Sequence, residues 1–416
     1  MKTLRLYKEN VYLTTSFAKI TNVNQTNNSF GISLDRTVFF PEGGGQSSDL
    51  GELIFDNGIR FAVTHVFEAD DDIIHVIEPL DHDKCQNEFV PEAGQTVSMV
   101  LDWSHRFDNM QRHCGEHLLT GIFDREYGGV NRGFHMGESY MTIDISMEKD
   151  PAYKELTWDM CLEAERLANE LIWNDTPMVV MQFETRKEAE KYPMRKPLTI
   201  DNDIQLVGIG SPENGWGQVM CCGTHPSTCG QVGMIKVFKL ESNKGMYRVY
   251  FEAGKRAFLK YQNEMEIMHN LGKKLSAGAE DLLEKFEKND ARNRDVSDRF
   301  YHLRKEVIRR EALSIGDGDV RTYDILTVDD LMDLAKQLMP KISTICFLYH
   351  RPSNTIVLVS SEKTQKGGKY DCGKLVKENA SIYNGKGGGS PQSARAMFDK
   401  PEYAETFIDL ITKHLR

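Results

Sequence analysis

The stretch Arg112-His113-Cys114-Gly115-Glu116-His117-Leu118-Leu119 is the part of this sequence around which the rest is organised. Its two imidazoles, His113 and His117, are four residues apart and precede an apolar run. On a helix, positions i and i+4 share one face one turn apart, so both rings can reach the same metal ion. The pattern predicts a helix over residues 103–127 that carries half of a metal site.

A second stretch, MCCGTHP at residues 220–226, has two more ligand types at the same spacing. Cys221 and His225 are four residues apart, while Gly223 and Pro226 favour a loop or helix end over a helix interior. One thiolate and three imidazoles form a borderline-soft set that suits zinc better than magnesium or calcium. We therefore expect one zinc ion bound by His113, His117, Cys221 and His225.

Each pair also has an ordinary interpretation, since an isolated HxxxH is common on helices that bind no metal. The residues His113-x-x-Glu116-His117 further match the HxxEH signature of one class of metallopeptidase, in which the glutamate is the general base. Such a peptidase needs a carboxylate ligand, and no residue of this chain is marked as one. Glu116 can also form an ordinary i,i+4 ion pair with Arg112.

Length and composition limit the class of protein. The 416 residues can form two to four domains. A formal net charge of −11 argues against a protein that coats nucleic acid by bulk electrostatics, but it is compatible with a local basic patch. The sequence shows no secretory signal and no apolar run long enough to span a membrane, and its eight cysteines do not suggest a disulfide framework. We expect a cytoplasmic protein without a membrane partner.

The pattern of elements predicts an α+β fold in four parts. Short β-rich runs between Asn, Asp and Gly clusters predict a small β-barrel over residues 1–95. Residues 96–250 should form an α+β core around the metal, and residues 251–312 a charged helical linker. Residues 313–416 should form a separate α/β domain. A homodimer through the helical or C-terminal region is the second interpretation of the apolar spacing in the linker.

Several individual elements are predicted inside these parts. A second helix is expected over residues 151–173, and strands over 140–145 and 231–237 should form a sheet behind the metal. The linker should break into two helices near residues 276–279. The basic segment 185–197 is compatible equally with a nucleic-acid contact and with a solvated helix.

Two glycine-rich stretches are candidate binding elements. In TVFFPEGGGQ, residues 37–46, consecutive glycines permit positive φ and close approach of the backbone to a ligand, although this stretch alone favours a plain hairpin turn. In the C-terminal part, a run of lysines precedes NGKGGGS at residues 384–390. Lysines beside a glycine-rich turn that opens a helix would form a phosphate cradle. The residues expected in this cradle are Lys386, Gly387, Gly388, Gly389 and Arg395.

Three motifs occur in a fixed order: TVFFPEGGGQSSDLG, RHCGEHLL and CCGTHPSTCGQVG. Together they resemble the free-standing alanyl-tRNA editing proteins of the AlaX type and, equally, the editing domain of alanyl-tRNA synthetase. The helical segment and the glycine-rich C-terminal domain are similar to the tRNA-binding part of the synthetase, as in the long form of the family. The resemblance covers nearly the whole chain. Cys222 departs from the pattern, because the synthetase usually has glycine there, and it leaves open which of two sulfurs binds the metal.

The resemblance implies a zinc-dependent, ATP-independent hydrolase that deacylates seryl-tRNA mischarged on the alanine tRNA, with glycyl-tRNA as a second candidate. It assigns recognition of the seryl hydroxyl to Thr37, and it places Gln46 and the glycines Gly43, Gly44 and Gly45 in the editing-site loop. The resemblance also implies that the protein does not charge tRNA. Four protein ligands would close a tetrahedral site, which leaves open whether the zinc activates water or positions the substrate. The alternatives are an HxxEH metallopeptidase and a non-catalytic tRNA-binding protein.

Overall fold

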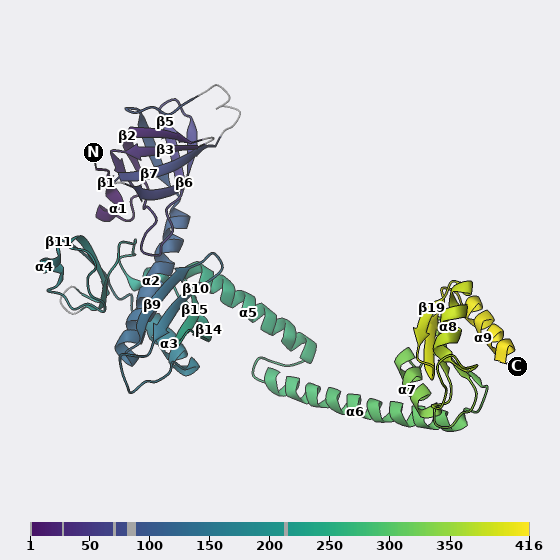
Figure 1. Ribbon diagram of the computed structural model, residues 1–416. Helices are drawn as coiled ribbons and strands as arrows, with labels where there is room; N and C mark the ends of the chain where they lie inside the picture. Colours follow the sequence, from purple (N-terminus) through teal and green to yellow (C-terminus); the bar gives the residue numbers. More distant parts are fainter. Residues whose placement is uncertain (1, 27–28, 70–71, 81–88, 212–214, 416) are drawn as a thin grey trace. The chain divides into compact units, whose positions relative to one another are not determined.

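A computed structural model describes residues 2–26, 29–69, 72–80, 89–211 and 215–415. The chain forms two compact units, Met1–Asn270 and Leu271–Arg416 (Figure 1). The predicted α+β class is confirmed. Among the described residues, no helix combines the length and apolar character needed to cross a membrane.

The first unit begins with a closed barrel of six antiparallel strands in the order β2-β3-β7-β6-β5-β8, which confirms the predicted N-terminal barrel. Every second residue of a strand points inward, and in the last strand Val97, Met99 and Leu101 are buried in this way. A short parallel pair, β1 with β4, leads into the single-turn helix α1. The bounds are β1 (Leu4–Arg5), α1 (Leu6–Glu9), β2 (Thr15–Thr26), β3 (Ser29–Leu34), β4 (Arg36–Thr37), β5 (Gly51–Phe55), β6 (Arg60–Ala69), β7 (Asp72–Pro79) and β8 (Thr96–Leu101).

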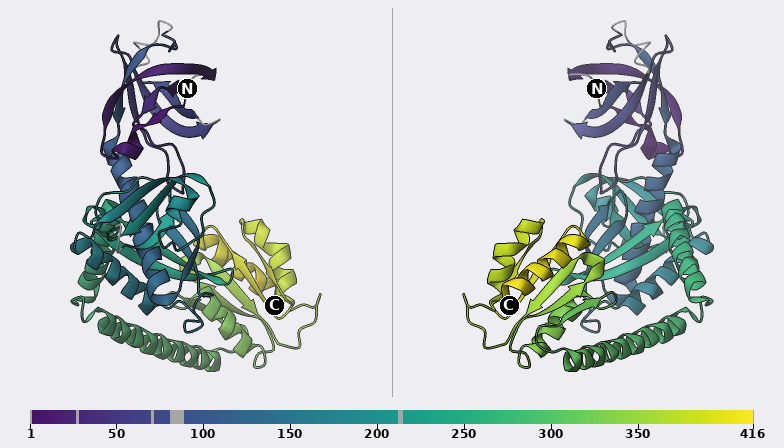
Figure 2. Two further views of the ribbon diagram at one scale, coloured as in Figure 1. Left: turned by 90° about the vertical axis from the view of Figure 1, so that its left-hand side faces the viewer. Right: turned by 90° about the vertical axis from the view of Figure 1, so that its right-hand side faces the viewer.

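The helix α2 (Trp103–Tyr127) follows the barrel directly and has the predicted bounds. The Asp102 side chain caps its start by accepting from the His105 N–H at 3.1 Å, and Gly128, at φ +65°, ends it in the left-handed conformation. Its middle is buried because it packs against a four-stranded sheet and a second helix (Figure 2). The helix that carries the first histidine pair is therefore held rigidly in the core.

The four-stranded sheet has the order β14-β15-β10-β9. Its strands are β9 (Val130–Met136), β10 (Met141–Ser146), β14 (Ile235–Asn243) and β15 (Met246–Ala253), and the second helix is α3 (Trp158–Trp173). The predicted first residues of one helix and of one strand are wrong. The helix begins at Trp158 rather than at 151, because the Thr157 side chain caps it by accepting from the Met160 N–H at 3.3 Å. Residues Cys229–Val232 form a 3-10 turn, so the strand begins only at Ile235.

A smaller antiparallel sheet completes the first unit. It contains β11 (Met178–Thr185), β12 (Asn202–Ile209) and β13 (Trp216–Met220), and β13 leads directly into the second metal motif. The short helix α4 (Arg186–Ala189) lies in the basic segment, where Arg186 forms ion pairs with Glu190 and Asp201 on the surface. These pairs favour the solvated-helix interpretation for this part of the segment.

The long helices α5 (Gly254–Leu275) and α6 (Leu282–Ser314) confirm the predicted break near residues 276–279. After α6, the second unit contains a five-stranded sheet in the order β16-β17-β18-β20-β19, which confirms the α/β prediction. Its further elements are β16 (Val320–Tyr323), α7 (Val328–Leu338), β17 (Cys346–His350), β18 (Thr355–Val359), α8 (Cys372–Asn379), β19 (Lys386–Gly389), β20 (Ser393–Met397) and α9 (Pro401–Leu415). The prediction that the glycine run is a turn that opens a helix is wrong: it forms edge strand β19, because its backbone pairs with β20.

A buried ion pair ties the glycine-rich segment of the barrel to α2. Arg106 and Asp49 are both 0% exposed, and Arg106 Nε lies 2.8 Å from Asp49 Oδ1. Asp49 Oδ2 also accepts from the Phe40 N–H at 2.6 Å. The pair therefore links the segment that precedes the glycines to the helix that carries the histidines.

We expect Asp49→Ala to lower the free energy of unfolding of the first unit by about 3–5 kcal/mol, because it leaves a buried guanidinium without a counter-charge. Calorimetry of the purified variant measures this loss. The matched control is Glu52→Ala, which breaks an exposed pair with Arg60 on the same barrel and should cost about 1 kcal/mol or less. A loss from Asp49→Ala as small as that of the control would contradict the prediction.

Candidate metal centre

Four buried side chains converge in the first unit. His113 and His117 come from α2, and Cys221 and His225 come from the loop after β13. Their candidate ligand atoms all lie within 4.8 Å of one another, and Cys221 Sγ is 3.3 Å from His113 Nε2 and 3.4 Å from His225 Nε2. In a tetrahedral zinc site with Zn–S of about 2.3 Å and Zn–N of about 2.1 Å, sulfur and nitrogen are about 3.6 Å apart. The arrangement therefore fits a single ion.

Two of the three imidazoles, those of His117 and His225, have ring nitrogens without the polar partners that buried rings normally have. Within the described part of the chain, His117 Nδ1, His117 Nε2 and His225 Nδ1 form no hydrogen bond. Burial lowers the pKa of His113 to about 4 and lowers the pKa of His117 and of His225 well below the ordinary value. The rings are neutral and keep lone pairs for a metal, which would satisfy one of the two orphaned nitrogens of His117.

Burial also raises the pKa of the Cys221 thiol. A thiolate at this buried position therefore requires a cation beside it, as a bound metal would provide. The neighbouring Cys222 is exposed and does not belong to the four-residue cluster. Of the two sulfurs that the sequence left open, the structure brings only that of Cys221 to the three imidazoles.

Gln46 connects the two halves of the cluster. Its Oε1 accepts from His113 Nδ1 at 3.0 Å and from the Thr224 N–H at 3.0 Å, while its Nε2 donates to Thr224 Oγ1 at 2.8 Å. The hydrogen bond at Nδ1 fixes the tautomer of His113 and leaves Nε2 facing Cys221. Gln46 thus orients the candidate ligand His113. Thr224, which was not predicted from the sequence, holds the Gln46 amide in place through its hydroxyl and its backbone N–H. The position of Thr224 inside CCGTH was the available signal.

Glycines allow the loop after β13 and the glycine-rich turn to pack closely against the metal cluster. A Cβ at Gly223 would overlap the ring of His113. Gly43 and Gln46 exchange backbone hydrogen bonds of 3.0 Å across a hairpin turn, in which Gly44 and Gly45 have φ of +60° and +83°. A Cβ at Gly45 would lie 2.8 Å from the Phe134 ring, which in turn stacks on His113. The predicted hairpin turn is present, and it packs against the metal cluster.

Thr37 makes its contacts inside the barrel. Its side chain is 0% exposed, and its Oγ1 lies 2.8 Å from His75 Nε2 and accepts from the Phe39 N–H at 3.0 Å. His75 Nδ1 faces the Ile32 carbonyl at 3.2 Å, so it donates there, and Nε2 accepts the threonine proton. Burial lowers the pKa of His75 to about 4, which keeps this ring neutral. The assigned role of Thr37 in recognising serine stays a prediction.

The ion pair with Arg112 that the sequence offered as an ordinary role for Glu116 does not form. Arg112 pairs instead with Glu252 of β15, with Nη2 at 2.9 Å from Oε1. Glu116 Oε1 accepts from Asn131 Nδ2 at 2.7 Å, and its other oxygen lies 3.8 Å from His117 Nε2. Burial raises the pKa of Glu116. Arg112 pairs with Glu252 rather than with Glu116 because Glu252 offers both carboxylate oxygens to the guanidinium.

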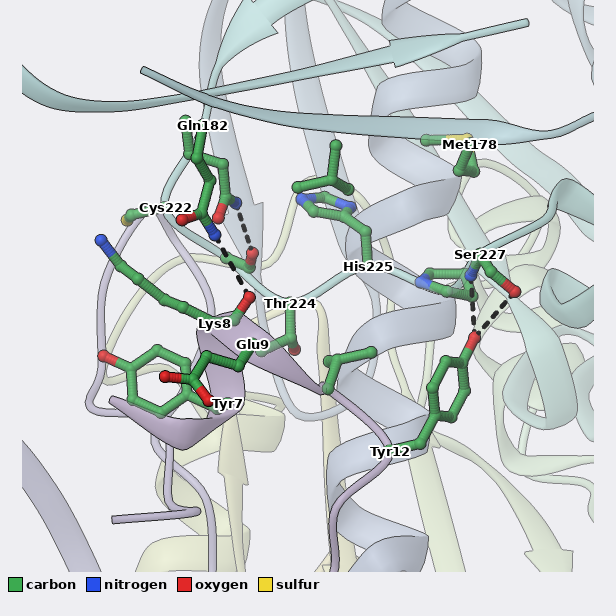
Figure 3. Close-up of a pocket in the computed structure, with 15 residues that line it drawn as sticks. Tyr7, Lys8, Glu9, Tyr12, Met178, Gln182, Cys222, Thr224, His225 and Ser227 are labelled. Carbon is green, nitrogen blue, oxygen red and sulfur yellow. Dashed lines mark hydrogen bonds between the residues drawn. The ribbon is translucent and has the colours of Figure 1, made fainter. Parts of the chain in front are cut away.

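A cavity of about 560 Å³ lies beside the cluster (Figure 3). Its walls are residues of the segment 7–12, one face of β11, Gln205 of β12, and the loop 222–227, which includes the candidate ligand His225. Thr37 is not among the residues that line it.

In the second unit, a cavity of about 700 Å³ brings Gly387, Gly388 and Gly389 together with lysines of α8 and the preceding loop. The lysines that line it are Lys366, Lys374 and Lys377. Lys386 and Arg395 belong to the same strand pair, β19 and β20, but do not line the cavity. The structure therefore assembles only part of the predicted cradle around this cavity.

Three family models match parts of the chain. The model for tRNA synthetases class II (A) matches residues 3–105, and that for the threonyl and alanyl tRNA synthetase second additional domain matches residues 204–250. The model for the DHHA1 domain matches residues 320–416. The second match includes β13 and the loop with Cys221 and His225.

Individual relatives extend these matches. The chain is 28% identical to the alanyl-tRNA editing protein AlaX-L of Pyrococcus horikoshii, over 99% of both chains. It is 32% identical to the alanyl-tRNA editing protein AlaX-M of Methanosarcina acetivorans, over 53% of this chain and 87% of that one. It is also 28% identical to the alanine–tRNA ligase of Pyrococcus abyssi, over 92% of this chain but only 41% of the ligase.

Proposed function

The chain belongs to the family of alanyl-tRNA editing proteins, and from this we propose that it is a zinc-dependent hydrolase acting on seryl-tRNA formed on the alanine tRNA. Proteins of this family are deacylases, which hydrolyse aminoacyl-tRNA esters. Glycyl-tRNA is the second candidate substrate. The observation that carries the proposal is the buried cluster of His113, His117, Cys221 and His225 beside an open cavity, in a chain that matches an AlaX-L protein along its length.

The four residues of the cluster would hold the zinc. When bound, zinc supplies a Lewis acid that can polarise an ester carbonyl or lower the pKa of water to about 7. The protein's own residues would define the geometry: Gln46 orients His113, and the Gly223 N–H donates to Cys221 Sγ at 3.4 Å. The four-ligand cluster contains no carboxylate, although an HxxEH peptidase would use one as a ligand.

Serine is a substrate for which a separate editing site is chemically necessary. A small apolar pocket rejects an added hydroxyl only weakly, so an alanine-charging enzyme makes seryl-tRNA by mistake. A second site that hydrogen-bonds this hydroxyl discriminates well, because alanine would leave a buried polar group unpaired. The cognate alanyl-tRNA is thereby spared.

The direct test is release of labelled serine from mischarged alanine tRNA by the zinc-loaded protein. Release from seryl-tRNA, with little from alanyl-tRNA, is the expected result. Binding of the tRNA without release would instead support a non-catalytic tRNA-binding protein. Peptide cleavage that is lost in Glu116→Gln would support the metallopeptidase.

For Thr37→Val we expect the rate on seryl-tRNA to fall by up to about tenfold, the worth of one neutral hydrogen bond, while the rate on alanyl-tRNA stays level or rises. Single-turnover deacylation of both substrates measures the ratio. Since Thr37 also bonds to His75, the control His75→Leu removes the same hydrogen bond and keeps the hydroxyl. An unchanged serine-to-alanine ratio in folded, zinc-loaded Thr37→Val would show that Thr37 does not discriminate. The same change of the serine-to-alanine ratio in Thr37→Val and His75→Leu would show that the change comes from loss of the hydrogen bond inside the barrel.

A further inference from the structure

We propose that Arg132, Arg195 and Lys196 bind backbone phosphates at the acceptor end of the RNA substrate, and we call these three residues the Arg195 patch. This role rests on the proposed function, because the substrate proposed there is an RNA. Two of the three residues belong to the second part of the basic segment 185–197. The first part contains α4, which carries surface ion pairs of its own.

Arg195 is held in place beside β13, the last strand of its sheet. Its backbone N–H donates to the Gln218 carbonyl at 2.8 Å, and its Nε donates to the Gly217 carbonyl at 2.9 Å. The two terminal nitrogens of the guanidinium form no hydrogen bond or ion pair with the residues that the structure describes. A planar pair of donors therefore remains for an anion.

The same contacts place the guanidinium of Arg195 beside α2, close to the metal cluster. A Cβ built at Gly217 would lie 3.7 Å from Gly121 Cα and 4.0 Å from Arg195 Nε, so the missing side chain of Gly217 makes room for this approach. Gly121 is one turn after His117 on α2, and β13 ends one residue before Cys221. The guanidinium is thus packed against two elements that carry candidate metal ligands.

Lys196 and Arg132 add two more positive charges at this place. Lys196 lies at the surface and forms no hydrogen bond or ion pair with the described part of the chain. Partial burial lowers the pKa of its ammonium. The Glu116 carboxylate opposes this effect, while the positive charges of Arg195 and Arg132 add to it. The three cations are therefore close enough to repel one another.

Nearby carboxylates do not balance these charges. Glu148 forms an exposed ion pair with Arg132, and such pairs contribute little and exchange readily. Glu116 is buried, and its Oε1 already accepts from Asn131 Nδ2 at 2.7 Å. Arg195 and Lys196 thus lack a counter-charge at the surface, and a bound anion would relieve the repulsion among the three cations.

An RNA backbone is the anion that fits this position. The ester of the substrate must reach the metal cluster, so the phosphates of the acceptor end are the part of the tRNA that comes nearest to the Arg195 patch. Guanidinium groups bind phosphate oxygens through two parallel hydrogen bonds, and a lysine adds a point charge. Because the chain has a net charge of −11, it needs local patches of this kind to attract RNA.

The test compares two double variants that remove equal charge from the full, zinc-loaded chain. Arg132→Gln with Lys196→Gln removes two cations of the patch, while Arg195 stays because its hydrogen bonds hold the segment on β13. Lys187→Gln with Lys191→Gln is the control, since both lysines are exposed, belong to the same basic segment and lie outside the patch. The probe is an uncharged RNA hairpin with the acceptor stem and single-stranded 3′ end of the alanine tRNA. Fluorescence anisotropy measures its affinity from low to high salt.

We expect the patch variant to reduce the slope of log affinity against log salt by about 2, because each lost phosphate contact reduces it by about 1. KM for the serylated hairpin should rise by about tenfold, with little change in kcat, because a phosphate contact is the same in the ground state and the transition state. The zinc content should be unchanged. The control variant should keep the wild-type slope and KM.

An unchanged slope in the patch variant would overturn the inference, as would an equal change in both double variants. If the wild-type protein releases serine in either of these cases, the proposed function stands without the patch. If the slopes change as expected but no serine is released, the proposed function fails and the RNA contact stands.

Discussion

Cys221→Ala is expected to abolish both zinc binding and deacylation, whereas Cys222→Ala should retain both. Cys221 Sγ lies within 3.4 Å of two imidazole nitrogens, while Cys222 is exposed and outside the cluster. Removing one of four ligands from a buried site leaves three neutral imidazoles that hold the ion far less tightly. His117→Ala should have the same effect, because its ring belongs to the same cluster.

Zinc per chain after dialysis, measured by elemental analysis, and serine release from the same samples give the two readouts. About one zinc per wild-type chain is expected. Gln46→Leu is the graded variant: it removes the hydrogen bond to His113 Nδ1 and should lower metal affinity by about 10- to 100-fold without abolishing it. Retention of zinc by Cys221→Ala together with loss from Cys222→Ala would show that the ligand assignment is wrong.

Removal of the second unit should weaken binding to the whole alanine tRNA by about two to three orders of magnitude and flatten its salt dependence, because fewer phosphates are neutralised. The cut belongs after Leu275, at the end of α5, because a cut near residue 250 would pass through β15. The first unit has its own hydrophobic cores in the barrel and around α2. It should therefore keep its zinc and its rate on a short acceptor-stem substrate.

Charge substitutions test whether the cavity beside β19 is the part of the second unit that contacts the tRNA. The triple variant Lys366→Ala, Lys374→Ala and Lys377→Ala removes the lysines that line the cavity beside β19. It should reduce the slope of log affinity against log salt by about 2 to 3, with near-normal release of serine at saturating tRNA. The control removes the same charge from elsewhere in the unit, at Lys336, Lys400 and Lys413. An equal change of slope in both triple variants would show that the cavity has no special role.

Local spacing made much of this molecule predictable. The four-residue separations of His113 from His117 and of Cys221 from His225 are properties of the chain itself, so the sequence alone indicates each half of the cluster. The Asp102 cap and Gly128 define α2 from its own sequence, and the break between α5 and α6 follows the SAGA segment in the same way. Short β-rich runs separated by turn residues likewise predicted a barrel. In each case the deciding interactions lie within a few residues along the chain.

Only the tertiary structure decided which side chains pair, where the glycine run of the second unit lies and where the cavity forms. Long-range packing chooses among partners that are equally plausible in sequence. Arg112 could pair locally with Glu116, but Glu252, 140 residues away, offers a bidentate partner. Gln46 reaches His113 across 67 residues through a turn whose glycines permit the approach. The run at Gly387–Gly389 becomes an edge strand because β20 provides the hydrogen-bonding partners that a turn would lack. The cavity beside His225 is built from four separate segments, so no local pattern could have indicated it.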